Sequence, residues 1–529
     1  VVVQPPVGPK GPQPMVVNRY GDWIVDPYGT IQNPAACPQG QGCVGQKTQT
    51  AGIQEAINYI INNGGGRVFI RSGTYNGSQI VANTNVPLLI EGDQPIINTP
   101  FFQIITTSFA YLRNLSFIQS STTNNTPFVW LKGSTSNPAD VDAYQGHVVA
   151  EQLYIDAQAG TLSNDILWVA QLKTAILRDI KLVGPNTAGS LQTYGIGILK
   201  VEGMEAVSQS GVLIYTDNVV GEVDISDSII YASSGNQASL AVVAVLPTWY
   251  PVAHVRLKGL KLFDTATGST GGQIIRVLTN TSNTPQSGQD YSVVVEDVDI
   301  SSSSSFLDSV IAHQGGGTLS IKNVRAVANP NAFLHVFNNY PMAFTAEAIS
   351  LYTDENPTNL FRFEPLNNSS PLVGSIRSWK IYSSSSINAY LFTTDMPSST
   401  GYPYTRVVID DYYIIDSNFL NAVVTQTGYV YNFVSLTNKN GYYVAIPSVS
   451  TPSVPSSGTA VANNNPFPVL VYLYGGTVTE VQITRNGTTY TVFSNSSGVS
   501  MSGQAFRLDP GDSITLTYSS APSWVWVPA

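Results

Sequence analysis

A short apolar motif recurs along most of the chain and constrains its fold more than any other feature. Each copy has an apolar residue, two other residues, a second apolar residue, one other residue and a third apolar residue, except that Ser228 takes the middle position of one copy. The copies start at residues 112, 150, 177, 225, 257, 295, 321, 346, 376 and 409, so consecutive starts are 25 to 48 residues apart. Such spacing is typical of solenoids, in which each repeat buries its apolar face only by stacking on its neighbours.

The residue before the middle apolar position of each copy indicates a sharp bend. Alternation on each side of the two-residue gap gives two short strands whose apolar side chains point inward. The bend between them favours residues that tolerate the left-handed backbone region, namely Gly, Asn and Asp. Seven of the ten bend positions carry one of these residues, and the full set is Asn114, Gln152, Asp179, Asp227, Gly259, Asp297, Asn323, Ala348, Ser378 and Asp411. The motif therefore predicts successive strand pairs wound around one apolar axis.

The segment that precedes the repeat resembles the opening of the pectate-lyase-like superfamily. Apolar residues at helical spacing over 53–61 are followed by three glycines, a strand at 68–70 and a Gly-Thr-Tyr ending. The matching residues are Ile53, Gln54, Ala56, Ile57, Gly64, Gly65, Gly66, Val68, Ile70, Gly73 and Tyr75, and 88–97 resembles the next coil. The resemblance implies an all-β fold, a right-handed parallel β-helix with an N-terminal capping helix. It implies no activity, because the superfamily includes lyases, hydrolases, epimerases and non-enzymatic viral spikes.

The ends of the chain differ in composition from the repeat, which we expect to occupy 51–440. Residues 1–50 are rich in Pro, Gly and Gln and predict an extended arm. Cys37 and Cys43, the two cysteines of the chain, suggest a local disulfide made in an oxidising compartment. The first residue, Val1, is consistent with a removed leader or with a chosen boundary.

A second unit is expected after the repeat. A Pro/Ser-rich stretch at 441–462 predicts a semi-extended linker. Alternating strands then predict a small β-sandwich over 463–529, at 469–474, 478–485, 489–493, 513–518 and 524–527. Asn486-Gly487 predicts a tight turn. This unit resembles the compact terminal modules of phage and archaeal-virus fibres.

Charged residues make up 11% of the chain, less than half of the usual share. Hydroxyl and amide side chains replace them, which suits either an acidic habitat or an ordinary secreted β-rich protein. The net charge of −10 argues against nucleic acid as a partner. No apolar run is long enough for a membrane span. Eight glycosylation sequons suit a surface protein, at Asn76, Asn114, Asn124, Asn280, Asn367, Asn368, Asn486 and Asn495.

Catalytic motifs are sparse. Asp410 and Asp411 are the candidates for paired carboxylates, but Asp411 occupies a bend position, where other copies have Asn or Gly. Of the polygalacturonase motifs only an Asp-Asp is present, and the four histidines are scattered. No cofactor or metal motif occurs. The sequence therefore favours a binding protein over an enzyme.

Long segments between motif copies predict loops at 118–147, 183–222 and 263–292, where recognition residues are usual. Aromatic residues that could stack on sugar rings are Trp130, Tyr144, Tyr194, Trp249 and Tyr250, each with buried packing as the alternative. Trp524 and Trp526 share one side of a strand and form either core or an exposed platform.

Three functions remain open. The first is a spike, turret or fibre protein on a virion surface that binds a host cell-surface glycan or protein. The low-charge composition resembles proteins of thermoacidophilic archaeal viruses, and resemblance to viral β-helices implies a homotrimer with other virion or surface-layer subunits as partners. The second is a cellular surface adhesin or filament subunit, and the third is a polysaccharide lyase or hydrolase.

Overall fold

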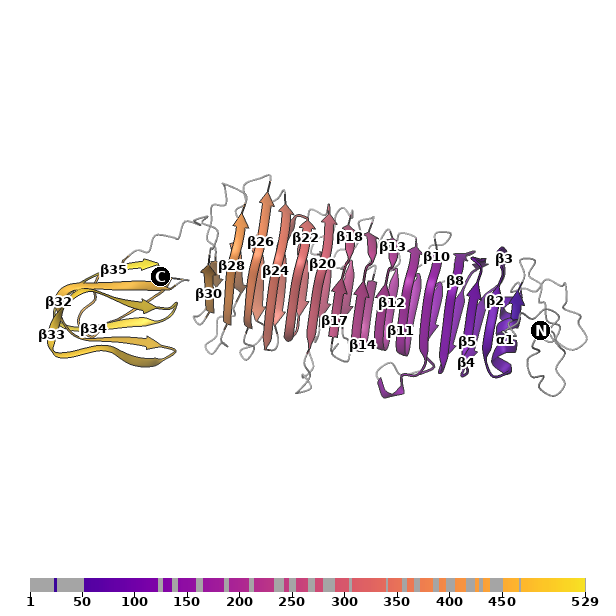
Figure 1. Cartoon of the computed structure of the whole chain (residues 1–529), viewed down its shortest axis with the longest axis horizontal. Helices are drawn as coiled ribbons and strands as arrows, with labels where there is room; N and C mark the ends of the chain where they lie inside the picture. The colour runs from indigo at the N-terminus through magenta and orange to yellow at the C-terminus, as the bar shows by residue number, and fades with distance from the viewer. Residues whose placement is uncertain are drawn as a thin grey trace, which may run out of the picture.

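A computed structural model describes most of the chain. The described residues are 23–25, 52–121, 127–135, 141–157, 165–184, 190–208, 214–232, 242–246, 254–264, 272–278, 291–303, 307–338, 341–353, 359–365, 372–383, 390–395, 405–414, 424–427, 432–437, 451–465 and 468–528. Strands β1 to β30 pair in parallel, and β31 to β35 form a separate antiparallel sheet. Figure 1 shows the parallel strands stacked side by side as an elongated rod. The expected parallel β-helix with a small all-β C-terminal unit is confirmed.

The strands of the β-helix lie on three faces, which we call the first, second and third sheets. The first sheet contains β1 (Trp23–Val25), β2 (Gly66–Ile70), β5 (Leu88–Gly92), β8 (Phe109–Gln119), β10 (His147–Asp156), the later parts of β11 (Leu167–Val183), β12 (Leu191–Glu202) and β14 (Ile214–Ser226), β17 (His254–Lys258), β20 (Ser292–Ser302), β22 (Gly317–Val327), β24 (Met342–Thr353), β26 (Leu372–Ser383), β28 (Thr405–Ile414) and β30 (Asn432–Thr437).

The second sheet follows the bend and contains β3 (Thr74–Asn76), β6 (Ile96–Thr99), β13 (Glu205–Ser208), β15 (Ile229–Ala232), β18 (Lys261–Asp264) and the ends of the long strands that cross the bend. The third sheet contains β4 (Ile80–Thr84), β7 (Phe102–Thr106), β9 (Val129–Lys132), the beginnings of β11, β12 and β14, β16 (Val243–Leu246), β19 (Gly272–Leu278), β21 (Leu307–Gln314), β23 (Pro330–Asn338), β25 (Asn359–Pro365), β27 (Tyr390–Asp395) and β29 (Val424–Thr427).

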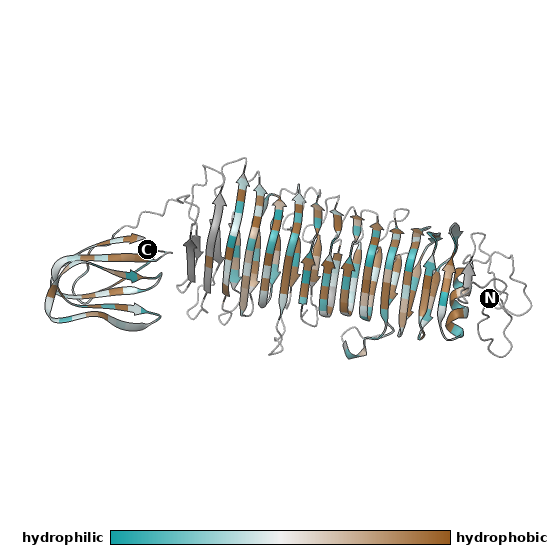
Figure 2. Cartoon of the chain, viewed as in Figure 1, coloured by the Kyte–Doolittle hydropathy of each residue, from teal (hydrophilic) through white to brown (hydrophobic). Residues whose placement is uncertain are grey.

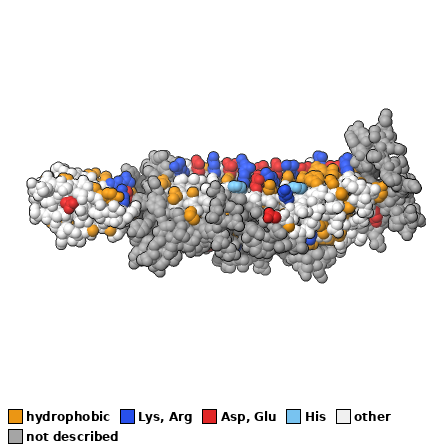
Figure 3. Space-filling model, turned by 90° about the horizontal axis from the view of Figure 1, so that it is seen from below, with side chains coloured by type: hydrophobic (Ala, Val, Ile, Leu, Met, Phe, Trp, Pro, Cys, Tyr) orange, Lys and Arg blue, Asp and Glu red, His pale blue; other side chains and the backbone are white. Residues whose placement is uncertain are grey.

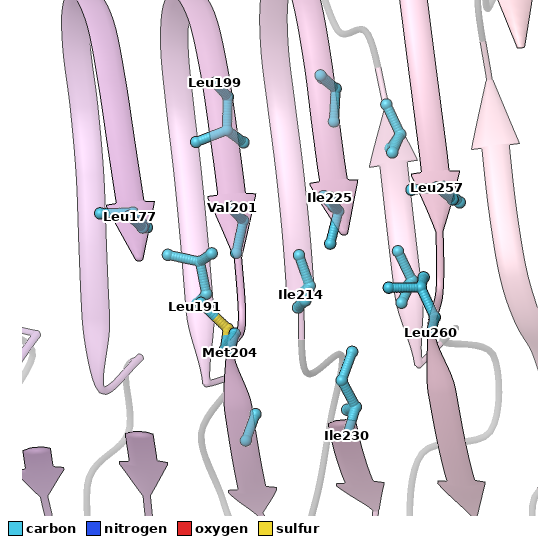
Figure 4. Close-up of a cluster of buried hydrophobic side chains, with 14 of the residues drawn as sticks. Leu177, Leu191, Leu199, Val201, Met204, Ile214, Ile225, Ile230, Leu257 and Leu260 are labelled. Atoms are coloured by element: carbon cyan, nitrogen blue, oxygen red, sulfur yellow. The ribbon is translucent and has the colours of Figure 1, made fainter. Parts of the chain in front are cut away.

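The bends have the predicted backbone conformation. Nine of the ten predicted positions, from Asn114 to Ser378, have φ between +49° and +65°. The middle apolar positions that follow them, from Leu115 to Trp379, are no more than 2% exposed. Ser228, the polar exception, is buried with its hydroxyl bonded to the backbone of Met204 and Ser226. Figures 2 and 4 show the apolar positions repeated from coil to coil, with Leu177, Val201, Ile225 and Leu257 in one row.

One coil and the third sheet were not predicted from the motif. The 48-residue step between the copies at 177 and 225 contains a complete coil, with Gly203 at the bend (φ 66°) and Met204 buried. The segments 118–147, 183–222 and 263–292, expected to be loops, contain β9, β12 and β19. Loops of unequal length separate these strands from the motif copies, so the sequence spacing does not reveal their period.

The N-terminal end is covered as expected. The helix α1 (Ile53–Asn62) buries Ile53, Ala56, Ile57 and Ile60. The Gln54 side chain bonds both backbone groups of Val81, at 2.6 and 2.7 Å, and so satisfies an edge that parallel strands would otherwise leave open. Within the expected arm, Trp23–Val25 pairs with β2 as one more rung. Cys37 and Cys43 lie outside the described residues.

The C-terminal unit contains β31 (Ala460–Ala462), β32 (Val469–Arg485), β33 (Thr488–Leu508), β34 (Ser513–Ser520) and β35 (Ser523–Pro528). The two strands expected at 469–474 and 478–485 are one strand, bent at Gly475 and Gly476 with φ of 64° and 67°. The expected turn at Asn486-Gly487 is present. Residues 451–462, expected to belong to a linker, instead contact this unit, for example through Trp524 Nε1 and the Pro452 carbonyl at 2.7 Å.

Candidate binding face on the third sheet

The outward side chains of the first sheet form a ladder of alternating charge. In register from coil to coil the ladder contains Glu91, Arg113, Glu151, Arg178, Glu202, Ser226, Lys258, Glu296, Lys322, Glu347 and Arg377. Arg178 contacts Glu151 at 2.8 Å and Lys258 contacts Glu296 at 3.8 Å. Figure 3 shows blue and red side chains alternating along one edge of the rod. Opposite charges neutralise each other on this face, which suits it for stability more than for binding a charged ligand.

The two catalytic candidates fall into structural series. Asp410 pairs in register with Arg377 at the end of the charge ladder. Asp411 follows it at the bend position, in line with Asn323, Ala348 and Ser378. Both lie on β28, where the side chains are outside the described set. Their register favours the structural interpretation over a catalytic pair.

The third sheet has a different outward surface. One row of outward positions, which we call the third-sheet row, runs through consecutive coils as Gln103, Trp130, Trp168, Gln192, Tyr215, Ala244, Arg276, Ala312, His335 and Arg362. It contains aromatic, amide and basic side chains and no carboxylate. A few polar groups beside aromatic surface are the usual lining of a ligand site. Because a sheet holds the row, its spacing is that of the strands, roughly 4.8 Å per coil.

A pair of stacked indoles is the main feature of the third-sheet row. The rings of Trp130 and Trp168 are 5.1 Å apart and within 7° of parallel, and the Lys132 Nζ lies 4.4 Å from the centre of the Trp130 ring. Neither indole Nε1 has a hydrogen-bond partner. Burial lowers the pKa of Lys132. Both Nε1 atoms are buried, so the rings present apolar surface, which with the Lys132 ammonium beside it is suited to a ligand with C–H faces and hydroxyl groups.

Two further predicted aromatic residues, Tyr194 and Tyr144, lie near this pair. Tyr194 is in register with Ala170 and Lys132 on the next row of the same sheet and is half-buried. Tyr144, which follows the short helix η2 (Val141–Ala143), is 5% exposed and lies against Gly195, where an added Cβ would be 2.6 Å from the Tyr144 hydroxyl. Tyr144 is therefore a packing residue, and Trp130 and Tyr194 are partly exposed residues of this sheet. Trp249 and Tyr250 lie outside the described residues.

Trp524 and Trp526 are corrected from binding candidates to core residues. They are 5% and 3% exposed, and their rings meet edge to face at 5.6 Å inside the C-terminal unit. The alternation that placed them on one side of a strand was right, and that side faces the unit's own core.

A charged cluster on β21, β23 and β25, in the later coils of the third sheet, was not predicted. His335 is almost buried, with its ring nitrogens 3.4 Å from Asp308 Oδ2 and 3.4 Å from Glu364 Oε1, and Arg362 contacts Glu364. Burial alone would lower the pKa of His335, but its bonds to Asp308 and Glu364 outweigh burial and raise it. The His335 bond also lowers the pKa of Asp308, against the effect of burial. The scattered sequence positions gave no signal, because only the coil spacing brings them together.

Four sequons lie on described residues. Asn114 uses its amide in the bend, where Nδ2 donates to the Gly92 carbonyl at 2.8 Å. Asn76 accepts a bond from Asn98, Asn486 is exposed in its turn, and Asn495 accepts a bond from the Ser497 backbone. Asn124, Asn280, Asn367 and Asn368 are outside the described residues. Occupancy at these sites stays a prediction.

Two kinds of feature are absent from the described part of the chain, a metal-ion cluster and a membrane-spanning helix. No group of three or more His, Cys, Asp or Glu there is arranged to hold a metal ion. No helix among the described residues is long and apolar enough to cross a membrane.

Comparison with known proteins finds no matching family model and no matching curated protein. Among solved structures, the chain is similar to the tailspike of Pseudomonas phage phi297, with 10% identity, a TM-score of 0.39 and 92% of each chain covered. It is also similar to a double mutant of the tailspike of the E. coli bacteriophage HK620, with 10% identity, a TM-score of 0.31, and 95% of this chain and 92% of that chain covered.

Proposed function

We propose that the chain is a spike- or fibre-like protein of a virion surface that binds a host cell-surface glycan along the third-sheet row. The observation that carries this proposal is the stacked Trp130–Trp168 pair beside the Lys132 ammonium. Such rings offer a sugar an apolar surface on which its C–H faces can stack. Binding to a host protein would need a broader apolar patch than this narrow row supplies.

The β-helix supports this function mechanically. The Trp130 and Trp168 side chains stand on strands whose inward neighbours Val129, Leu167 and Val169 are completely buried. The rings are therefore held in place before a ligand arrives, which reduces the conformational entropy lost on binding. An elongated glycan can lie along the rod and contact several coils at once, so that weak individual contacts add.

A glycan array with the purified protein tests the proposal. The double variant Trp130→Ala plus Trp168→Ala should lose binding to the glycans that the parent chain retains. The matched control is Tyr352→Ala plus Tyr382→Ala, because these rings also stack on neighbouring coils, 4.4 Å apart and within 5° of parallel, but on the second sheet. Equal binding by both double variants would contradict the proposal.

A further inference from the structure

Arg276 differs from the other described basic residues of the β-helix in being half-buried without a partner. Among the lysines and arginines whose side chains the structure describes, it alone is neither exposed nor engaged in an ion pair, a hydrogen bond or an aromatic contact. The exposed ones are solvated, and the other half-buried ones have a carboxylate or a ring. Burying part of a guanidinium without a counter-charge costs free energy, and so its partner is expected to come from elsewhere.

The neighbours of Arg276 in the third-sheet row offer it no partner. It stands between Ala244 and Ala312, whose methyl groups are the smallest side chains of the row. Neither side chain has a group that could pair with the guanidinium. Further along, the carboxylates of Asp308 and Glu364 are already engaged by His335, Gln273 and Arg362.

The distance to the indole pair is compatible with one ligand. Arg276 is four coils from Trp168, through Gln192, Tyr215 and Ala244, which corresponds to roughly 19 Å at the strand spacing of a sheet. A glycan of several sugar rings spans this length. Arg276 and the indoles therefore lie on one row of the same sheet.

We propose that Arg276 binds an acidic group, a carboxylate or a sulfate, on a sugar of the glycan that lies along the third-sheet row. This inference rests on the proposed glycan-binding function and adds the substrate class, an anionic glycan. The planar guanidinium fork matches both groups, since each offers two oxygens to parallel N–H donors. The first sheet neutralises its own charges, whereas the third-sheet row has a positive charge at Arg276 that an anionic ligand neutralises.

The experiment compares the parent chain with Arg276→Gln on an array of neutral, uronate-containing and sulfated oligosaccharides, followed by titration of the best anionic glycan. The parent chain is expected to prefer anionic glycans, and the uronate and sulfate arms identify the acidic group. Arg276→Gln should weaken that binding roughly 10- to 100-fold, as expected for a lost charge-assisted contact. Binding of the parent chain should also weaken as salt concentration rises.

Two controls make the result decisive. Lys261→Gln removes the same charge from an exposed position on the second sheet and should change affinity less than twofold. Arg276→Lys keeps the charge but not the fork and should fall between the parent chain and Arg276→Gln. Unchanged affinity in Arg276→Gln, a preference for neutral glycans, or no binding of anionic glycans would overturn the inference. Loss of binding in the Trp130/Trp168 variant alone would leave the proposed function standing.

Discussion

The Asn323 side chain donates a hydrogen bond from Nδ2 to Oδ1 of Asp297 at 2.8 Å, one coil earlier in the same bend position. Both residues have positive φ, 52° and 56°. Short polar side chains thus serve the bend twice, because they tolerate the left-handed backbone and also bond to the next coil. The column of bend residues is therefore a continuous structural feature of the rod.

Replacing Asn323 separates these two contributions. Asn323→Gly keeps the backbone freedom and loses only the side-chain bond, whereas Asn323→Ala also forces a Cβ into the left-handed region. We expect Asn323→Ala to lower the free energy of unfolding by about 1–2 kcal/mol and Asn323→Gly to cost less. Thermal unfolding should rank the parent chain first, the glycine variant second and the alanine variant last. Equal losses for both variants would show that the backbone conformation is unimportant.

The charge ladder should add little stability per rung. Glu151 accepts bonds from Tyr111 at 2.9 Å and from Arg178 at 2.8 Å; burial opposes ionisation, but these bonds outweigh it and lower the pKa of Glu151. A lowered carboxyl pKa contributes stability that is present above the unfolded pKa and is lost as pH falls through the folded pKa. Glu151→Gln should cost less than about 1 kcal/mol at pH 7, because Arg178 is substantially exposed. Melting temperatures of parent and variant should converge near pH 3, and a constant gap would contradict this.

His313 should make the β-helix sensitive to acid. Its ring is 1% exposed in the core, and burial lowers its pKa to about 4, with the Val277 backbone opposing this only in part. The unfolded histidine takes up a proton near pH 6.5. Stability from the neutral ring is therefore complete above that pH and declines as pH falls from about 6.5 to about 4, by roughly 3 kcal/mol.

His313→Leu tests this by removing the titrating group while keeping an apolar side chain. The variant should lose less melting temperature between pH 7.5 and pH 4 than the parent chain does. If both chains lose the same amount, the buried imidazole does not govern acid stability.

His335 should show the opposite dependence. Because its pKa is raised, the stability it contributes is fully present below the unfolded pKa and is lost as pH rises through the folded pKa. Asp308→Asn removes one of its two acceptors and should lower the pKa of His335, measured by the NMR titration of the imidazole C–H signals. The stability gap between parent and variant should be largest near pH 5–6, where Asp308 is ionised and His335 protonated, and smaller at pH 9. An unchanged His335 titration would exclude Asp308 as its partner.

The fold could be predicted because its signal is local. The bend residues Asp179 and Asn323 take the same position in their copies of a six-residue motif, and the apolar residues of α1 are spaced as in a helix. The coil at Gly203 was not predicted, because its copy of the motif lies between the copies that start at residues 177 and 225. Val201, Met204 and Ala206 nevertheless follow the same pattern. A search that allowed glycine bends without regard to spacing would have found it.

The candidate site was predicted only in part. Trp130 and Tyr194 could be selected as aromatic residues. Trp168, Arg276 and His335 are brought into one row only by the pairing of strands that loops of unequal length separate. Register across those loops depends on how the first and second sheets stack. The chemistry of the third-sheet row is therefore a property of the three-dimensional repeat.

A structure of the protein with a bound oligosaccharide, selected from the array, tests the central claim most directly. We predict ligand density along the third-sheet row, with a sugar ring stacked against Trp168. Density on the first or second sheet, or on the C-terminal unit alone, would contradict the claim.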